Sequence, residues 1–308
     1  MLRSTFLYLS QQPQIFKFVR SNGLAQSFAN RFVAGETIET AMAAVKDLNS
    51  KGISATLDLL GESTTNESEA FAAQAEYLRL LDEINARKLD ANVSLKLTAM
   101  GMDLSDDLCV KIVRQILEKA KQYGTFVRLD MESSAYTERT LRMFEDKLYP
   151  GFEPYVGIVL QSYLRRTMTD VELANRLKAR VRICKGAYQE PAAVAFPEKG
   201  DVDDNYIAAM RQLMQHGNYP GLATHDERII AEAKRFAQQQ GIAKDKFEFQ
   251  MLYGVRRDLQ EGLVKEGYRM RVYVPYGTQW YPYLMRRLAE RPANVAFITG
   301  NVIKEMFA

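Results

Sequence analysis

Short segments rich in β-branched and aromatic residues recur along the chain at intervals of roughly 25 to 40 residues, a spacing typical of strands separated by helices. Most of these segments end in a polar residue, where the strand is expected to stop. Eight are present, at 53–60, 93–98, 126–131, 156–161, 181–186, 222–226, 247–252 and 271–276. The stretches between them carry apolar residues at helical spacing, so the pattern predicts an unbroken series of strand–helix units.

The region before this series shows helical spacing alone. Apolar residues share one face in each of two segments, namely Ile15, Phe18 and Val19 in the first and Ile38, Ala41, Val45 and Leu48 in the second. We therefore expect an N-terminal helical cap over residues 1–50, within the same domain as a strand–helix region over 51–308. No linker rich in Ser, Pro or Gly divides the chain further.

Eight strands with intervening helices fit either a closed (βα)8 barrel or an open doubly wound sheet. The strand count favours the barrel, and no GxGxxG or GxxxxGK[ST] motif follows the first strand, where an open nucleotide-binding sheet usually carries one. A barrel builds its active site at the carboxyl ends of its strands. The polar residues predicted there are Asp58, Lys96, Asp130, Gln161, Lys185, His225, Gln250 and Tyr273.

Composition narrows the class of protein. The 308 residues are 47% hydrophobic, enough for a large core, and 41 basic against 38 acidic residues give a net charge of +3. The two signs are interspersed, so no nucleic-acid surface is predicted. Two cysteines, no signal peptide and no apolar run of about 18 residues predict a cytoplasmic protein without disulfides or a spanning helix. Peripheral contact with the inner face of a membrane stays compatible with the sequence.

The segment WYPYLMRRLAERPAN, residues 280–294, has the highest density of candidate binding residues. Pro282 suits a first helical turn and Pro292 suits a helix end. On this helix Tyr283, Arg286, Arg287 and Glu290 share one face. Two adjacent guanidiniums can clamp a carboxylate or a phosphate. The alternative is a solvent-exposed face with an Arg–Glu pair, which the neighbouring aromatic residues make less favourable.

Two charged residues lie on neighbouring predicted strands. Lys96 stands between Leu95 and Leu97, points away from both, and needs a partner if it is buried. Asp130, near the end of the next strand, is the expected partner. Asp130 also suits a general base, a metal ligand or a structural ion pair with Arg128, and a second carboxylate follows at Glu132.

Further candidates follow the strands at 181–186 and 222–226. Arg182 and Lys185 stand near a strand end, and Gly186 permits close backbone approach to a ligand. His225, which precedes Asp226, is one of only two histidines, and we expect it to belong to the site. Two histidines without H-x-H or H-E-x-x-H spacing give too few ligands for zinc, so no metal centre is predicted.

Nine motifs occur along the chain in one order: LDLLGE, SLKLT, RLDME, VLQSY, RICKGAY, ATHD, FEFQMLYG, VYVPYG and YLMRRLAERPAN. Together they resemble the flavin-dependent proline dehydrogenases, in the short bacterial form with a single activity, from about residue 30 to the end. The resemblance implies a distorted (βα)8 barrel whose last helix lies over the strand ends. It also implies oxidation of L-proline to Δ1-pyrroline-5-carboxylate by hydride transfer from C5 to N5 of FAD. Electrons then pass to a membrane quinone, and a separate pyrroline-5-carboxylate dehydrogenase is a further candidate partner.

Matched motif by motif, the resemblance also implies roles for single residues. Arg286 and Arg287 would hold the proline carboxylate with the help of Lys96, and Asp130 would order Lys96 and the pocket. Tyr188, Leu252 and Tyr273 would form the wall around the ring. Relatives that prefer hydroxyproline have a smaller residue at position 273, so Tyr273 implies a preference for proline. The chemistry asks for no acid or base among the side chains.

The cofactor contacts and the gate are implied in the same way. The residues that match flavin contacts are Gln161, Arg182, Lys185, Gly186, Thr224, His225 and Glu290. Arg182 would stabilise the negative charge of the reduced flavin. Glu62 would pair with Arg286 to close the site. Asp58 is left with a structural role, and Gln250 yields to its neighbour Leu252.

The residues alone leave other functions open. Lys96 and Lys185, near strand ends of a barrel, also suit a Schiff-base aldolase or lyase. A non-catalytic module that binds an anion at Arg286 and Arg287 is a third reading. A phosphate-binding lyase is less favoured, because the segment YGVRRD after the seventh strand has a single glycine. Flavin colour in the purified protein and borohydride trapping would separate these classes.

Overall fold

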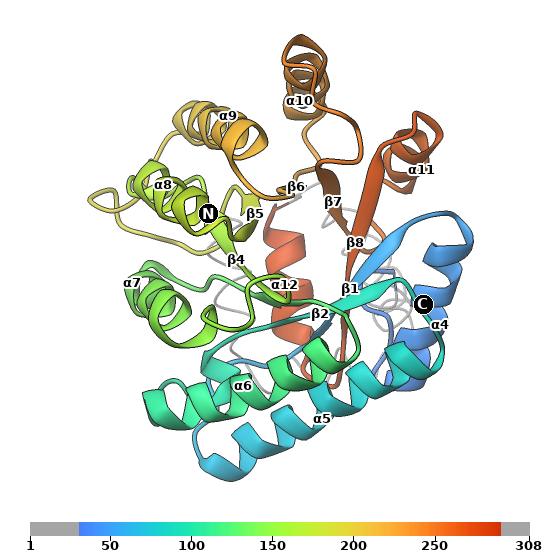
Figure 1. Ribbon diagram of the computed structural model, residues 1–308, viewed down its shortest axis with the longest axis vertical. Helices are drawn as coiled ribbons and strands as arrows, with labels where there is room; N and C mark the ends of the chain where they lie inside the picture. Colours follow the sequence, from blue (N-terminus) through green and yellow to red (C-terminus); the bar gives the residue numbers. More distant parts are fainter. Residues whose placement is uncertain (1–30, 291–308) are drawn as a thin grey trace, which may run out of the picture.

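The computed structural model describes residues 31–290, and side chains over 31–285. Eight parallel strands close into a barrel in chain order, as the sequence predicts. Their bounds are β1 Ser54–Leu59, β2 Ala91–Leu95, β3 Val127–Leu129, β4 Val156–Gln161, β5 Arg180–Cys184, β6 Gly221–Ala223, β7 Glu248–Leu252 and β8 Arg269–Tyr276. Figure 1 shows the barrel along its axis, with helices around the sheet.

The helices cover the outside of the sheet and one end of the barrel. Their bounds are α4 Ile38–Ser50, α5 Glu67–Ala86, α6 Asp106–Gln122, α7 Ser134–Met143, α8 Thr167–Leu177, α9 Lys199–His216, α10 Glu227–Gln239, α11 Arg257–Lys265 and α12 Trp280–Glu290, with a 3₁₀ turn η1 Thr98–Met100 and a π turn η2 Phe144–Leu148. Over residues 31–290, no helix is long and apolar enough to cross a membrane.

Helix α4 belongs to the outer ring. Its side chains Ile38, Ala41, Val45 and Leu48 are buried, which confirms the predicted apolar face. Thr37 caps the helix start: its side chain accepts from the N–H of Thr40. The helix packs against β1 and β8, so it covers the seam where the barrel closes. The segment with Ile15, Phe18 and Val19 lies outside the described residues, and the division at residue 50 stays a prediction.

Alternation along the strands separates two environments. In β1 and β5 the residues Ala55, Leu57, Val181 and Ile183 belong to the hydrophobic core between the sheet and the helices. Their neighbours along the strands point into the barrel and are polar, because successive side chains of a strand alternate between its faces. These inward residues are Thr56, Asp58, Asn92, Ser94, Arg128, Asp130, Arg180, Arg182, Glu248, Gln250, Arg271 and Tyr273. The lumen is therefore a hydrogen-bonded polar column, whereas most barrels of this class fill it with bulky aliphatic residues.

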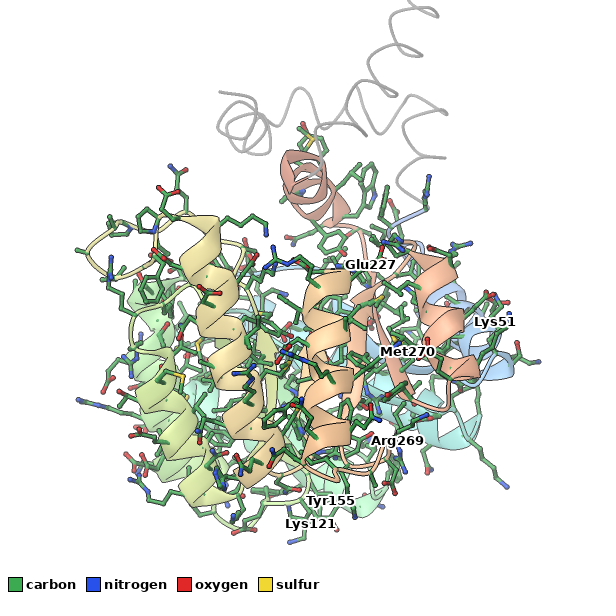
Figure 2. All side chains as sticks on the ribbon, turned by 90° about the horizontal axis from the view of Figure 1, so that it is seen from above. Lys51, Lys121, Tyr155, Glu227, Arg269 and Met270 are labelled. Carbon is green, nitrogen blue, oxygen red and sulfur yellow. The ribbon has the colours of Figure 1, made fainter. Side chains whose placement is uncertain are left out.

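Helix α12 lies across the carboxyl ends of the strands instead of beside β8, as the resemblance implied. It stands at the centre of the barrel in Figure 1 and above it in Figure 2. Its residues Tyr281, Tyr283 and Leu284 pack on loops at the strand ends in a small hydrophobic cluster that includes Phe32. Trp280 of the same helix donates through Nε1 to Glu36 at 2.9 Å. This anchoring gives the barrel a roof over its carboxyl end.

Candidate active site

Lys96 lies directly after β2 and forms a buried ion pair with Asp58. Its Nζ is 3.2 Å from Oδ1 and 3.1 Å from Oδ2 of Asp58, and the Asp58 side chain is 1% exposed. The predicted pair of Lys96 with Asp130 is therefore wrong, and the partner of Lys96 is Asp58, for which the sequence predicts a structural role. Asp58 approaches from β1, the other neighbour of β2, because the carboxylate of Asp130 is already occupied.

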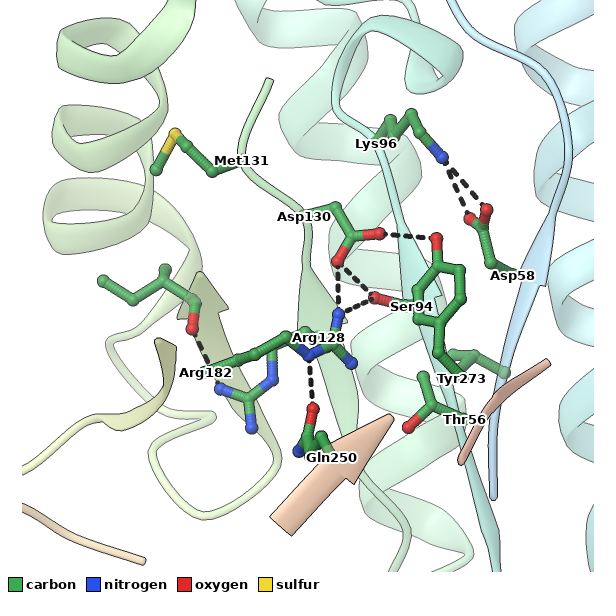
Figure 3. Close-up of polar contacts among 12 residues, drawn as sticks. Thr56, Asp58, Ser94, Lys96, Arg128, Asp130, Met131, Arg182, Gln250 and Tyr273 are labelled. Carbon is green, nitrogen blue, oxygen red and sulfur yellow. Dashed lines mark hydrogen bonds and ion pairs between the residues drawn. The ribbon is translucent and has the colours of Figure 1, made fainter. Parts of the chain in front are cut away.

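Asp130 accepts hydrogen bonds from three side chains of other strands (Figure 3). Its Oδ1 accepts from Ser94 Oγ at 2.6 Å and from Arg182 Nη1 at 2.8 Å, and its Oδ2 accepts from the hydroxyl of Tyr273 at 3.0 Å. Arg182 also donates through Nε to Gln250 at 2.6 Å. The alternative partner Arg128 is not used. Asp130 therefore orders the pocket through Arg182 and Tyr273 rather than through Lys96.

The charges of these groups follow from their surroundings. Burial works against the ammonium of Lys96, but the carboxylates of Asp58 and Asp130 outweigh it and raise the pKa of Lys96. Burial, with the negative charges of Asp130 and Asp58, raises the pKa of Tyr273 well above its usual value. Lys96 is thus a cation and Tyr273 a neutral donor over the whole physiological range.

Gln161, at the end of β4, offers an unused acceptor. Its amide nitrogen donates to the carbonyls of Met131 and Glu132 at 3.3 and 3.2 Å. Its Oε1 is buried without a hydrogen-bond partner among the described residues. Such an atom is costly unless a ligand satisfies it. The carboxylate of Glu132 instead accepts from the N–H and hydroxyl of Thr98, so it braces the loop after β3.

Lys185, directly after β5, sits between two carboxylates. Its Nζ is 2.6 Å from Asp203 Oδ1 and 2.9 Å from Asp226 Oδ2. Burial opposes the charge on both acids, but Lys185 prevails and lowers the pKa of Asp203 and of Asp226. Gly186 has φ of +107°, and a Cβ there would lie 2.4 Å from the ring of Tyr163. The group that lies close to the backbone of Gly186 is therefore the ring of Tyr163.

The end of β6 is fixed against the end of β7. His225 accepts through Nε2 from the N–H of Leu252 at 3.0 Å, so its neutral ring carries the proton on Nδ1. Thr224 is buried, and its hydroxyl accepts from the N–H of Asp226 at 3.0 Å. Leu252 packs with Tyr273 against the cluster under α12. Two predicted wall residues, Leu252 and Tyr273, are therefore brought together.

The remaining predicted residues are placed in part. Arg286, Arg287 and Glu290 belong to α12 over the barrel mouth, but their side chains lie outside the described part of the structure. Glu62 is exposed in the loop after β1, and its pairing with Arg286 stays a prediction. Tyr188 is half-buried in the loop after β5, close enough to Lys96 to influence its charge. Among the described side chains of residues 31–285, no group of three or more His, Cys, Asp or Glu is arranged to hold a metal ion.

Sequence reasoning gave Asp58 a structural role, set Gln250 aside in favour of Leu252, and did not name Ser94. A signal for them is present in the strands themselves. In ISATLDLL, VSLKLT and FEFQML polar residues alternate with apolar ones, which places every polar member of a strand on one face. Ser94 stands two residues before Lys96, and Gln250 two residues after Glu248. The inward polar column is identified when every second residue of each strand is included, and not only the last polar one.

Comparison with known proteins agrees with this geometry. The family model described as proline dehydrogenase matches residues 41–300. Proline dehydrogenase 1 of Bacillus subtilis (strain 168) is 45% identical over 305 residues, covering 99% of this chain and 100% of that protein. Proline dehydrogenase of Deinococcus radiodurans is 44% identical, with 98% of both chains covered. The crystal structure of proline utilization A from Bdellovibrio bacteriovorus, inactivated by N-propargylglycine, has a TM-score of 0.82 and 29% identity, over 90% of this chain and 34% of that one. The chain belongs to the proline dehydrogenase family.

Proposed function

We propose that this protein oxidises L-proline to Δ1-pyrroline-5-carboxylate by hydride transfer from C5 of the substrate to N5 of FAD. Proline oxidation, and with it a place in proline catabolism, follows from membership of the family. The cofactor and the route of the electrons are the proposed part. The observation that carries the proposal is the set of prearranged polar groups under α12, which includes a buried acceptor that no group of the described residues satisfies.

The carboxyl end of the barrel fits a flavin ring. An isoalloxazine presents one N–H donor and several acceptors along one edge. The unpartnered Oε1 of Gln161 suits the donor, and the guanidinium of Arg182, held by Asp130 and Gln250, suits an acceptor. When bound, FAD supplies the hydride acceptor, a chemistry that protein side chains lack. A fixed cation at Arg182 favours the negative charge that accumulates there on reduction.

On the substrate side the chain supplies position rather than acid–base chemistry. Lys96 is a cation held in one orientation by both oxygens of Asp58, and it faces the space below α12 that Arg286 and Arg287 would close. Three cations around one carboxylate fix the orientation of the pyrrolidine ring. Tyr273 and Leu252 would then limit the volume beside the ring, because both lie in the cluster under α12.

The environments of the lysines count against a Schiff-base reaction. Such a nucleophile must be neutral in its reactive form, which requires a lowered pKa. Lys96 has a raised pKa in a buried ion pair, and Lys185 is bound by two carboxylates. Neither amine is available for attack on a carbonyl carbon.

The proposal extends to the partners of the reaction. Electrons leave the reduced cofactor for a quinone, which brings the protein from the cytoplasm to the inner face of a membrane as a peripheral partner. The product is an imine that a separate pyrroline-5-carboxylate dehydrogenase would consume. These steps rest on the family resemblance alone.

Anaerobic mixing of the purified protein with L-proline tests the proposal. We expect visible flavin absorbance in the pure protein and its bleaching by proline, but not by D-proline. Arg287→Met should bleach only at proline concentrations on the order of 100-fold higher, with FAD still bound, because one ionic contact to the carboxylate is lost. A colourless protein that reconstitutes with no flavin would refute the cofactor. Loss of FAD in Arg287→Met at unchanged proline affinity would refute the role of the arginine.

A further inference from the structure

A second polar cavity lies at the opposite end of the barrel from the proposed flavin site. It has a volume of about 340 Å³ and is lined by residues just before β2, β3 and β4, including Asp90, Phe126 and Tyr155, and by the first inward residues of the strands. Figure 2 shows Tyr155 at the end of the molecule that faces away from α12. The cavity therefore lies toward the end of the barrel that faces away from the carboxyl-end site, although Arg182 and Gln250 take part in both.

Cations outnumber carboxylates around this cavity. Four arginines line it, namely Arg128, Arg180, Arg182 and Arg271, whereas Glu248 and Asp90 are the acidic lining residues, which leaves an excess of two positive charges. Arg271 is paired with Glu248 at 2.8 Å, and Arg182 is paired with Asp130 outside the cavity. Asp90 accepts from the hydroxyl of Ser54 at the rim. Among the side chains described, those of residues 31–285, no carboxylate forms an ion pair with Arg128 or Arg180.

The two unpaired arginines lie on the same aromatic ring. The guanidinium of Arg128 lies 4.7 Å from the ring centroid of Phe126, and that of Arg180 lies 4.2 Å from the same ring. The Nε atoms of both arginines are buried and have no hydrogen-bond partner in the described structure. Burial, and then the charges of the neighbouring arginines, lower the pKa of Arg128. A buried and a half-buried guanidinium favour an added counter-charge, because no carboxylate among the described side chains forms an ion pair with either.

The backbone is built to hold Arg128 in this position. Its Nη1 donates to the carbonyls of Ile158 and Arg180 at 2.9 and 2.5 Å. Gly157 stands between Arg128 and Arg180 in the strand register, and a Cβ there would lie 2.8 Å from Nη1 of Arg128. Glycine therefore leaves the space that the guanidinium fills. Arg128 is 3% exposed, so its unused donor is oriented before any ligand arrives.

We propose that this cavity is a binding site for a small oxyanion, a phosphate or a carboxylate, held by Arg128 and Arg180. Planar guanidiniums with free donors match the oxygens of such an anion, and the bound charge offsets the excess of arginine. Arg128 and Arg180 lie at the amino end of the strands and are not among the residues proposed to hold proline or the flavin, whereas Arg182 and Gln250 line the cavity and also reach Asp130 of the carboxyl-end site.

Calorimetric titration of the full-length protein with inorganic phosphate, at ionic strength matched with chloride, tests the site. We expect one saturable event per chain and a Tm that rises by about 3 °C at tenfold the Kd. Arg180→Met should weaken binding at least about tenfold, since one charged contact is lost. Arg180→Lys keeps the positive charge but loses the planar guanidinium with its paired donors, and should weaken binding about threefold. Parallel titrations with sulfate and acetate distinguish a tetrahedral anion from a carboxylate.

Two matched variants separate the sites. Arg269→Met removes an exposed guanidinium at the same end that does not line the cavity, and should leave the Kd within about twofold. Arg287→Met removes a proposed carboxylate contact at the other end and should also leave phosphate binding unchanged. The proposal is overturned if no saturable binding occurs, if Arg269→Met weakens binding as much as Arg180→Met, or if Arg287→Met alone abolishes it. None of these outcomes depends on proline turnover.

Discussion

The two ends of the barrel lumen carry similar residues in different balance. At the carboxyl end the described cations Lys96 and Arg182 each have a carboxylate partner, Asp58 and Asp130 respectively. At the amino end Arg128 and Arg180 stack on one phenylalanine, and among the described residues neither has an acidic partner. A neutral, closed network suits a region that must hold fixed positions around a substrate. A network with an excess of positive charge suits a region that binds an anion.

The difference teaches that polar residues inside a barrel serve two purposes. The carboxyl-end pairs bury charge at a cost, which close geometry and additional hydrogen bonds offset. Gln250 joins the ends, because its Oε1 accepts from Arg182 and its Nε2 donates to Glu248 at 2.6 Å. A change at one end therefore reaches the other through a single amide. The predictions below probe this division in order of expected effect.

The largest effect is expected from Asp58→Ala, which leaves the buried ammonium of Lys96 without its partner. The free energy of unfolding should fall by about 3–5 kcal/mol. Asp82→Ala is the matched control, because it breaks the pair with Lys119, also a Lys–Asp contact at 2.6 Å but solvent-accessible. That change should cost about 0–1 kcal/mol. Chemical unfolding of both variants gives the comparison, and equal losses would show that burial does not set the strength of the carboxyl-end pair.

The next effect concerns acid stability at the amino end. Burial opposes the charge of Glu248, but Arg271 outweighs it and lowers its pKa from the usual 4.5 to about 2. A lowered pKa stabilises the fold above the unfolded-state value and is lost as pH falls through the folded-state value. We therefore expect Glu248 to contribute about 3 kcal/mol near neutrality, lost between roughly pH 4.5 and 2.

Unfolding curves at pH 7, 4 and 3 measure this contribution. The deficit of Glu248→Gln relative to the natural protein should shrink as the pH falls. Glu266→Gln, which alters an exposed pair with Lys234, should follow the natural protein at every pH. A deficit for Glu248→Gln that is the same at pH 7 and 3 would argue against a lowered pKa.

A smaller effect is expected on substrate choice. Tyr273→Ser removes the ring beside Leu252 and the hydrogen bond to Asp130. The kcat/KM for proline should fall about tenfold, and discrimination against hydroxyproline should relax, because space opens beside the ring. Tyr219→Ser removes a hydroxyl that donates a hydrogen bond to Glu248 at the amino end. This change should lower the free energy of unfolding without changing the discrimination against hydroxyproline. Unchanged kinetics of Tyr273→Ser with both substrates would refute the role of the wall.

The smallest effect is expected from Thr56→Val in the middle of the column. The Thr56 hydroxyl donates to Asn92 Oδ1 at 2.7 Å, and this oxygen also accepts from Arg271 at 3.0 Å. Its loss leaves the acceptor satisfied, so the stability should fall by only about 0.5–1.5 kcal/mol. A loss as large as that of Asp58→Ala, measured by the same unfolding experiment, would mean that the column behaves as one cooperative unit.

The fold was predictable because its signals are local. Each strand is a short apolar segment with a polar residue at its end, and helix α4 shows its buried face in the spacing of Ile38, Ala41 and Val45. The predicted segment 93–98 extends past the observed strand, which ends at Leu95. Lys96 therefore stands beyond the ladder, where its side chain is free to turn toward β1.

The pairing inside the site was not predictable from adjacency. Lys96 and Asp130 each follow a strand of the same neighbouring pair, which made them the natural partners in the sequence. Arg182 decides otherwise, because its long side chain crosses the lumen from β5 and takes Asp130. The strand order could be predicted. Which residue a long side chain contacts across the barrel could not, because that depends on side-chain conformation as well as on strand order.

Helix α4 has a consequence for the order in which the molecule assembles on the ribosome. The seam between β1 and β8 can form only after β8 has been translated, and β8 follows the other seven strands of the barrel. The helix that covers this seam precedes β1 in the chain. Until β8 is made, α4 can be shielded by β1 and α5, with the β8 side of its apolar face open to solvent. The nascent protein thus carries a prepared docking surface that only β8 completes.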